Sequence, residues 1–501
     1  MENRINIIEK NLELKSICRR IHHRVEVSLP IRLETKTDSL NLPLNLTGYT
    51  TDISEGGLGV ILKERLKVSS NLRLFIDSTI HYPTFQTEAI TLWKDTDILV
   101  KDGVIRYGLR FSETKDRDLV RDFLNKVSLY LVENFFGFAL PDHLREACKD
   151  NYVLEKFDQK QIMRVIDFVP PFLKIGKMII LGHDKNNILQ NVGFAAGVLT
   201  TKDTQGHYNN AIHLAQCGQL MSSAASIYLA LLFPSTAPQV VEVDQIRLSQ
   251  VGVLLELPSP AENYFFIEIH IIKKKLQLVI VNTKIFFSKA IVCEIDRLKL
   301  ILISKESIWK AKELPAKNED FFKKTNTDEI ERFFGVTSPE HIKKSYVNQQ
   351  ISKRLNQQEI MKIVDFTPPF LKIDKIMIFN ADKNQIDQTF SLGMGIVTSG
   401  DTSGHYNETI FLAMCGWLMA SAVSIHLAVL FPSTAPEVIE AKGIKPIEKE
   451  MWKPPANGAI FWVETRVIKK TGQLVMLKTK ISFDEIPYGV AEESKAILLQ
   501  K

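Results

Sequence analysis

Three arginines lie close together near the start of the chain, just ahead of the first strand-like sequence. CRRIHHRV (18–25) places Arg20 and Arg24 four residues apart, with Arg19 adjacent. Guanidinium groups make bidentate hydrogen bonds to phosphate and stack on purine rings. Each charge-assisted bond of this kind contributes about 1.5–3 kcal/mol. On its own, however, the pattern is equally typical of a basic linker.

A second short pattern follows within the next strand-like region. TTDISEGGLGV (50–60) sets Asp52, Ser54 and Gly57 in D-x-S-x-x-G spacing. Carboxylate and hydroxyl oxygens can hydrogen-bond to the edge of a base, and a glycine lets a backbone approach closely. On its own this pattern also describes an ordinary turn in which an Asp side chain bonds to the backbone.

Together the two patterns resemble the PilZ domain, a bacterial receptor for cyclic di-GMP. That family has R-x-x-x-R on the linker entering its barrel and D/N-x-S-x-x-G on the barrel. GLRF (108–111) is similar to its late strand, and the resemblance covers roughly residues 17–132. It implies that the arginines wrap over a dinucleotide while Asp52 and Ser54 read guanine edges. The implied cyclic di-GMP site consists of Arg19, Arg20, Arg24, Asp52, Ser54 and Gly57.

The sequence around these patterns fits a small antiparallel β-barrel. VEVSLPIRLE (25–34) alternates apolar and polar residues, as a half-buried strand does. Further short strand-like stretches follow, separated by turns at the spacing of a barrel. A helical stretch over 116–135 is expected to close the unit.

The rest of the chain repeats itself. Residues 135–242 and 333–440 align without a gap at a constant offset of 198, and about half of the positions are identical. Each copy is too long for a solenoid unit, so this is a duplicated domain. Such a domain usually folds as a pseudo-symmetric pair that imitates a C2 homodimer, and its two copies are free to diverge.

Each copy contains one long apolar stretch, 213–233 in the first and 411–431 in the second, without Asp, Glu, Lys or Arg. The length is close to that of a membrane-spanning helix. However, both stretches contain Gln, Ser or His and many small residues, and they lack basic flanks. We therefore favour a buried helix wrapped by an antiparallel sheet, which is the layout of the hotdog fold.

The resemblance to hotdog enzymes extends to short motifs. IMKIVDFTPPFLKIDKI (360–376) is similar to the opening of the β-hydroxyacyl carrier-protein dehydratases, and GHYN matches their G-H-F segment, whose His is catalytic. GHYN and the following helix also look like FcoT-type long-chain acyl-CoA thioesterases. These matches imply that His207 and His405 stand at catalytic positions. Asn209 and Asn407 match the Asn of the thioesterase motif.

The chain departs from the dehydratases at the carboxylate that those enzymes carry on the central helix. Alignment places that Glu at Gln219 in the first copy and at Trp417 in the second. A glutamine keeps the shape but cannot exchange a proton usefully, and a tryptophan would fill the pocket. A site that pairs His405 with Gln219 is thus expected to be open. The site that pairs His207 with Trp417 is expected to be plugged.

We therefore expect one working acyl-thioester site. Its candidates are His405, Tyr406, Asn407, Gln219 and Glu408, with His207 and Asn209 in the other copy. Glu408 is the nearest carboxylate that could serve as a base for water. Backbone N–H groups at a helix N-terminus supply an oxyanion hole without side chains, so hydrolysis is easier to support than dehydration. The alternative is that the GHYN turn only caps the helix, braced by Asp203 and Asp401.

Composition excludes several other functions. The chain has 501 residues, a net charge of +5 and no long Lys/Arg run, so nothing favours nucleic acid. The five cysteines lack metal-ligand spacing, which fits a reducing cytosol; Cys217 and Cys415 on the apolar helices read as core residues rather than nucleophiles. The charged N-terminus is not a signal peptide. We expect a cytoplasmic protein without a metal or redox cofactor.

The predicted fold class is α+β multidomain: an N-terminal PilZ-like antiparallel β-barrel followed by two hotdog repeats that form a pseudo-dimer. The predicted parts are an N-terminal segment (1–16), the PilZ-like domain (17–134), hotdog repeat 1 (135–290), a charged, partly helical linker that includes the start of repeat 2 (291–353), and hotdog repeat 2 (354–501).

The leading functional hypothesis is an acyl-CoA or acyl carrier protein thioesterase regulated by cyclic di-GMP. One alternative is a non-catalytic cyclic di-GMP effector whose degenerate double hotdog binds acyl chains or proteins. The third is a dehydratase-like enzyme. The expected partners are the nucleotide and an acyl thioester, with no membrane span. Three points stay open: whether the double hotdog forms a homo-oligomer, which acyl chain it takes, and in which direction the nucleotide controls it.

Overall fold

The structure is a computed structural model that describes most of the chain. The described residues are 24–36, 43–67, 69–77, 84–95, 104–112, 117–149, 151–166, 173–182, 187–200, 214–249, 264–287, 290–305, 329–347, 349–364, 371–381, 386–402, 412–447 and 457–500. The chain divides into two compact units, Met1–Glu155 with Leu181–Asn187, and Lys156–Ile180 with Ile188–Lys501. Each unit is considered by itself.

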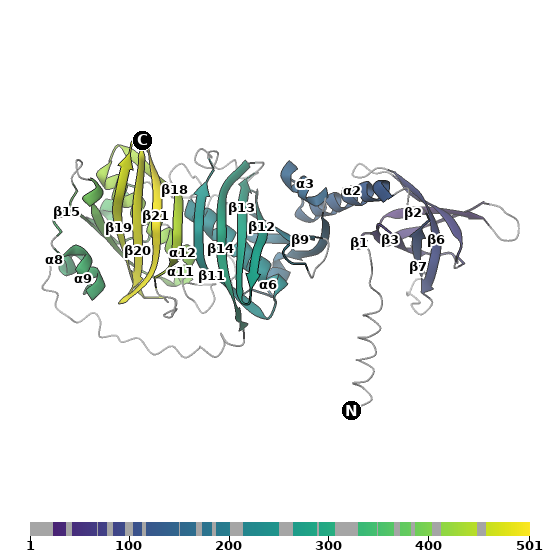
Figure 1. The fold of residues 1–501 in the computed structure, drawn as a ribbon, viewed down its shortest axis with the longest axis horizontal. Helices are drawn as coiled ribbons and strands as arrows, with labels where there is room; N and C mark the ends of the chain where they lie inside the picture. Colours follow the sequence, from purple (N-terminus) through teal and green to yellow (C-terminus); the bar gives the residue numbers. More distant parts are fainter. Residues whose placement is uncertain are drawn as a thin grey trace, which may run out of the picture. The chain divides into compact units, whose positions relative to one another are not determined.

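The first unit contains a closed antiparallel barrel of six strands (Figure 1). Its strands are β2 (Pro30–Lys36), β3 (Pro43–Ser54), β4 (Gly57–Leu62), β5 (Asn71–Ile76), β6 (Phe85–Asp95) and β7 (Ile105–Phe111). The order β3-β2-β5-β6-β7-β4 closes through pairing of β4 with β3, and the short β1 (Arg24–Glu26) adds to β3. Alternation in β5 buries Leu72, Leu74 and Ile76, while Arg73 is exposed and Phe75 is half-buried, as the strand period requires.

A long helix, α2 (Arg117–Phe136), contributes to the core of this unit and is followed by α3 (Asp142–Lys149). Val120, Phe123 and Val127 are buried in one cluster with the barrel interior. The ring of Phe123 stacks on Phe85 of β6 with centroids 4.7 Å apart. The helix therefore closes the unit, as the sequence predicted.

The second unit is built around an antiparallel sheet that contains both copies of the repeat; the boundary between the units falls within β8 and β9. The first copy supplies β8 (Tyr152–Asp158), β9 (Ile175–Gly182), β10 (Val192–Val198), β11 (Thr236–Leu248), β12 (Tyr264–Lys275), β13 (Leu278–Phe287) and β14 (Ala290–Ser304). The second copy supplies β15 (Ile351–Asn356), β16 (Lys375–Phe379), β17 (Phe390–Ile396), β18 (Thr434–Pro446), β19 (Ile460–Thr471), β20 (Leu474–Phe483) and β21 (Ile486–Gln500).

Short helices complete the two copies. They are α4 (Gln159–Ile162) in the first copy, and α8 (Glu329–Phe334), α9 (Glu340–Tyr346), α10 (Gln357–Met361), the 3-10 helix η4 (Ile386–Gln388) and α11 (Ser399–Thr402) in the second. Asp158 and Asn356 begin α4 and α10 with the same capping box, in which the side chain accepts the N–H three residues on.

The strand order reverses at the middle of the sheet. It runs β15-β16-β17-β19-β20-β21-β18 and then β11-β14-β13-β12-β10-β9-β8. The equivalent strands β11 and β18 pair antiparallel at this seam, with Ile246 opposite Ala441 and Val243 opposite Ile444. Val243 corresponds to Ala441 in the repeat, and Ile246 corresponds to Ile444. Each position of one copy therefore contacts the other position of the second copy, which is the geometry of an isologous dimer interface.

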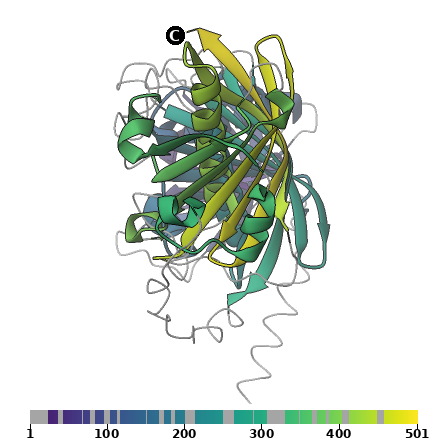
Figure 2. The ribbon, with the colours of Figure 1, turned by 90° about the vertical axis from the view of Figure 1, so that its left-hand side faces the viewer.

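One long helix lies inside the curved sheet of each copy. These helices are α6 (Leu214–Leu232) and α12 (Leu412–Leu430), and Figure 2 looks onto the second copy, whose strands wrap around α12. Among the described helices, α12 alone is long and apolar enough to cross a membrane, with a mean hydropathy of 1.8 and 67% of that window buried. It packs on β18–β21, so its apolar surface is covered by its own sheet. The predicted fold class, a barrel followed by two hotdog repeats, is confirmed.

A buried polar cluster distinguishes the core of the second copy from that of the first. His426 of α12 is fully buried, and its Nδ1 lies 2.7 Å from Ser391 Oγ and its Nε2 3.4 Å from Thr389 Oγ1. At the equivalent position of the first copy, the Tyr228 hydroxyl donates to the Asn191 carbonyl over 3.1 Å. Each copy thus satisfies its buried polar side chain in a different way.

We expect the stability of this unit to fall in mild acid because of His426. Burial lowers the pKa of His426 from 6.5 to about 3. Between pH 6.5 and pH 3 the unfolded chain binds one more proton, on His426, than the folded chain does. The contribution of neutral His426 to the free energy of unfolding is therefore complete above pH 6.5 and is lost as the pH falls. The loss between pH 6.5 and pH 5 should be about 2 kcal/mol. Urea denaturation at pH 6.5 and at pH 5 measures this loss. The variant His426→Tyr/Ser391→Gly has no histidine to protonate, so the prediction is contradicted if its free energy of unfolding falls with pH as steeply as that of the wild type.

Candidate functional site

The barrel brings the two predicted nucleotide-binding patterns together. Strand β1 pairs with β3 so that Arg24 lies opposite Ser54 and Glu26 opposite Asp52. The segment that enters the barrel therefore runs alongside the D-x-S-x-x-G strand, although the two patterns are separated in sequence. The side chain of Arg24, and all of Arg19 and Arg20, lie outside the described residues.

Asp52 is buried and faces a partner that sequence reasoning missed. It is 5% exposed, and its Oδ2 accepts hydrogen bonds from Arg106 Nη2 over 3.1 Å and Thr51 Oγ1 over 3.0 Å. Arg106 lies on β7, and 41% of its side chain surface is exposed. No local motif marks this arginine, because only closure of the barrel brings β7 to β4 and β3. The Arg106 guanidinium thus stands beside the predicted carboxylate.

The Ser54–Gly57 turn is sterically constrained. Ser54 Oγ donates to the Gly57 carbonyl over 3.0 Å, which closes the turn between β3 and β4. Gly57 has a φ of +156°, and a Cβ there would lie 2.0 Å from the Leu109 carbonyl oxygen of β7. Only glycine allows this approach of the two strands. The predicted reading of guanine edges by Asp52 and Ser54 stays a prediction.

Six of the seven predicted catalytic residues of the double hotdog are outside the part of the chain that the structure describes. His207, Asn209, His405, Tyr406, Asn407 and Glu408 lie outside the described residues. Gln219 on α6 and Trp417 on α12 are described, and both are partly exposed. The expected contrast between an open and a plugged site therefore stays a prediction.

An ion pair ties together the two motifs that precede α12. Lys372 ends the PPFLK segment and bonds to Asp401, which begins the DTSGHYN segment; their side chains are 15% and 7% exposed. Asp401 Oδ2 also accepts hydrogen bonds from Thr398 N over 2.8 Å and Thr398 Oγ1 over 2.6 Å. The bracing role predicted for Asp401 thus has a physical basis. Its equivalent Asp203 lies outside the described residues.

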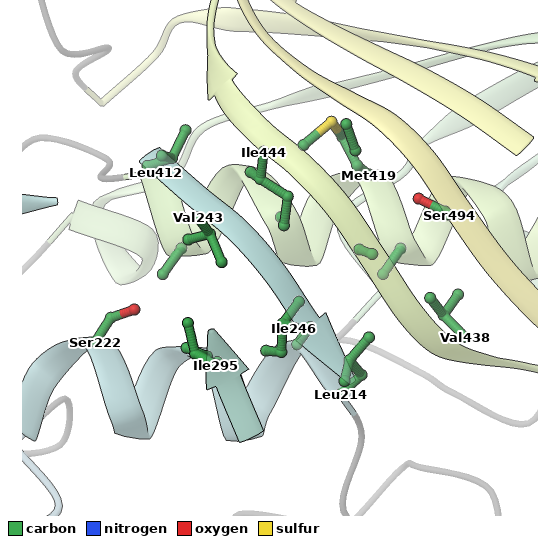
Figure 3. A pocket seen from close by; sticks show the side chains of 17 residues that line it. Leu214, Ser222, Val243, Ile246, Ile295, Leu412, Met419, Val438, Ile444 and Ser494 are labelled. Atoms are coloured by element: carbon green, nitrogen blue, oxygen red, sulfur yellow. The ribbon is translucent and has the colours of Figure 1, made fainter. Parts of the chain in front are cut away.

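An apolar pocket lies where the two copies meet (Figure 3). Its cavity volume is about 50 Å³, within a wider hollow of about 580 Å³ that includes space open to solvent. Equivalent residues line it from both copies: Leu214 and Leu412, Ala215 and Ala413, Gly218 and Gly416, and Ile246 and Ile444. Its walls are aliphatic side chains, glycines and two serines, and neither Gln219 nor Trp417 belongs to them.

The cysteines of the described region are buried and poorly suited to nucleophilic chemistry. Cys148, Cys217, Cys293 and Cys415 are all buried without a disulfide. Burial raises the pKa of Cys415, so its thiol is protonated at neutral pH. This agrees with the interpretation of Cys415 as a core residue. Among the described residues, no three His, Cys, Asp or Glu side chains gather into a metal site.

Comparison with known proteins decides the identity of the barrel. The model of the PilZ domain family matches residues 19–126. The match covers about a fifth of the chain and assigns this part, not the whole chain, to the PilZ domain family. A search of curated proteins finds no match for the chain.

Solved structures similar to the chain fall into two groups. The PilZ domain of YcgR from Escherichia coli with c-di-GMP is 23% identical, covers 21% of this chain and 88% of its own, and has a TM-score of 0.17. A dehydratase domain of a mycocerosic acid synthase-like polyketide synthase is 8% identical. The match covers 65% of this chain and 96% of that domain, with a TM-score of 0.40.

A third similar structure belongs to the group of hotdog enzymes. A thioesterase II described from Thermobifida fusca is 10% identical, covers 61% of this chain and 92% of its own, and has a TM-score of 0.34. The assignment of the hotdog fold to this chain rests on its strand order and buried central helices rather than on these scores.

One carboxyl group outside the PilZ domain also escaped sequence reasoning. Burial raises the pKa of Glu437 on β18 to about 7, and the next residue, Val438, lines the apolar pocket. The repeat offers a signal for it, since the equivalent residue in the first copy is Gln239. A carboxyl that titrates near neutral pH suits proton transfer, although the contacts of Glu437 assign it no role.

Proposed function

We propose that this protein binds cyclic di-GMP at its PilZ domain and thereby controls an acyl-thioester site in its double hotdog. The β1–β3 register carries the nucleotide part of the proposal, because it joins Arg24 to the strand that bears Asp52 and Ser54. The c-di-GMP in the YcgR structure supports the same ligand. Arg19 and Arg20 are proposed to hold phosphate groups from the entering segment.

The acyl part of the proposal is supported by the apolar pocket between α6 and α12. Its aliphatic lining suits the hydrocarbon part of an acyl-CoA or acyl carrier protein thioester. We favour hydrolysis, with water held by His405, Asn407 and Gln219 and activated by Glu408. Dehydration is less well supported, because neither Gln219 nor Trp417 can supply an acid. The proposed location is the cytoplasm.

A second candidate is a non-catalytic effector. In this case the double hotdog binds an acyl chain without turnover and the nucleotide alters contacts with another protein. The observation that favours it is the loss of the helix carboxylate in both copies, at Gln219 and Trp417.

Calorimetric titration of the full-length protein with cyclic di-GMP tests the nucleotide part. Arg20→Ala should weaken binding by about 10- to 150-fold, because one charge-assisted contact is lost. Arg73→Ala is the matched control, since it removes the same charge from β5, an exposed position away from β3 and β4 in the barrel order. Equal affinities of the two variants would reject the proposed site.

Acyl-CoA hydrolysis, measured with and without the nucleotide, then tests the acyl part. Turnover that changes with cyclic di-GMP supports a regulated thioesterase. Nucleotide binding without any hydrolysis favours the non-catalytic effector.

A further inference from the structure

The apolar pocket is asymmetric, although the two copies line it with equivalent elements. In the first copy Val243 pairs across the strands with Leu298. In the second copy the equivalent pair is Ala441 and Ser494, and both are smaller. Ala491 likewise stands where the first copy has Ile295. The pocket is therefore deeper on the side of the second copy.

Two hydroxyl groups face this otherwise aliphatic space. Ser222 of α6 is 3% exposed and Ser494 of β21 is 5% exposed. Both line the pocket, and Figure 3 shows their hydroxyls turned toward it from opposite sides. Within the described part of the chain, neither hydroxyl has a hydrogen-bond partner. Each is present in one copy only, because the equivalents are Ala420 and Leu298.

Both hydroxyls are reached from the pocket, so they are placed to hydrogen-bond to a ligand that brings oxygen atoms into this otherwise apolar space. The pocket has no aromatic wall on which a flat ring would stack. Its aliphatic walls instead suit a flexible chain. Ordered water is the competing explanation for the two hydroxyls, and the test below separates the two.

We propose that this pocket binds one aliphatic chain that carries a hydroxyl or oxo group along its length, and that Ser222 and Ser494 recognise this oxygen. The proposal rests on the proposed acyl site for the class of ligand, and it adds a preference for oxygenated over saturated chains. We expect one chain per protein rather than two, because a pocket on the pseudo-twofold axis holds a single occupant.

The test uses the full chain and three free acids as probes: dodecanoate, 3-hydroxydodecanoate and 12-hydroxydodecanoate. Free acids are not hydrolysed, so binding is measured whether or not the protein is an enzyme. Titration calorimetry gives the affinity ratio of each hydroxylated acid to dodecanoate. Ser222→Ala/Ser494→Ala removes both hydroxyls. Ser421→Ala is the matched control, because Ser421 is buried on α12 but does not line the pocket.

We expect at least one hydroxylated acid to bind more tightly than dodecanoate, with a stoichiometry of one. The double alanine variant should lower the affinity ratio by about 2- to 12-fold for each hydrogen bond lost, and Ser421→Ala should leave it unchanged. An affinity ratio that is the same in the wild type and the double variant would overturn the inference and indicate water on the serines.

A variant whose side chains fill the pocket distinguishes failure of the proposed serine contacts from failure of the acyl site itself. Ala491→Ile/Ser494→Leu gives the second copy the residues of the first, so the local backbone has a precedent for them. This variant should abolish binding of all three acids. If the wild type binds none of the acids, the acyl site and the inference both fail. If the filled variant still binds dodecanoate, the chain lies elsewhere and the inference fails alone.

Discussion

Replacing Asp401 with alanine is expected to lower the free energy of unfolding by about 3–5 kcal/mol, because the change leaves the ammonium of Lys372 buried without its counter-charge. Both side chains are largely buried, so solvent screens the pair little. The change also removes the acceptor for the N–H and hydroxyl of Thr398. Urea denaturation at pH 7 measures the loss.

The double variant Lys372→Met/Asp401→Asn is the informative control for this prediction. It removes both charges, and the asparagine keeps an oxygen that can accept the Thr398 N–H. We expect it to be markedly more stable than Asp401→Ala, because no buried charge is left alone. A cost below about 1 kcal/mol for Asp401→Ala, the range of exposed pairs, would show that this pair behaves as a surface salt bridge.

Replacing His426 with tyrosine should lower the free energy of unfolding by about 3 kcal/mol, combining overpacking with the loss of hydrogen bonds. The first copy shows why. There Tyr228 fits only because Gly193 has no side chain, since a Cβ on Gly193 would lie 2.7 Å from the tyrosine ring. In the second copy Ser391 occupies that position and its hydroxyl bonds to His426.

Adding Ser391→Gly to His426→Tyr should restore most of the lost stability, since it recreates the arrangement of the first copy. The matched control is Ser391→Gly alone, which leaves His426 without its closest partner and should be destabilising. Thermal unfolding of the four proteins forms a double-mutant cycle. Additive effects of the two substitutions would show that the two residues are not coupled.

The features that the sequence could predict are those that depend on residues close together in the chain. Period-2 alternation predicted the barrel strands, and the repeat with its charge-free stretches predicted the two central helices. The D-x-S-x-x-G pattern marked the turn between β3 and β4, because a turn and its neighbours are contiguous; the binding role of Asp52 and Ser54 stays a prediction. The repeat also predicted the pseudo-dimer, since two equal copies favour an isologous pairing.

The features that sequence missed depend on contacts between distant segments. Arg106 meets Asp52 only after the barrel closes. The partner of His426 is Ser391, on a strand of the other layer. Ser222 and Ser494 face one space only because the copies meet along β11 and β18. None of these pairs has a fixed spacing, so local pattern cannot find them.

The paired strands β11 and β18 have a consequence for how the protein responds to dilution. In a homodimer, the corresponding seam would dissociate as the concentration fell, and the pocket would be lost with it. Here the partners belong to one polypeptide, so each meets the other at an effective concentration on the order of millimolar. The pocket should persist at nanomolar protein, and its ligand affinity should not depend on how much of the protein a cell contains.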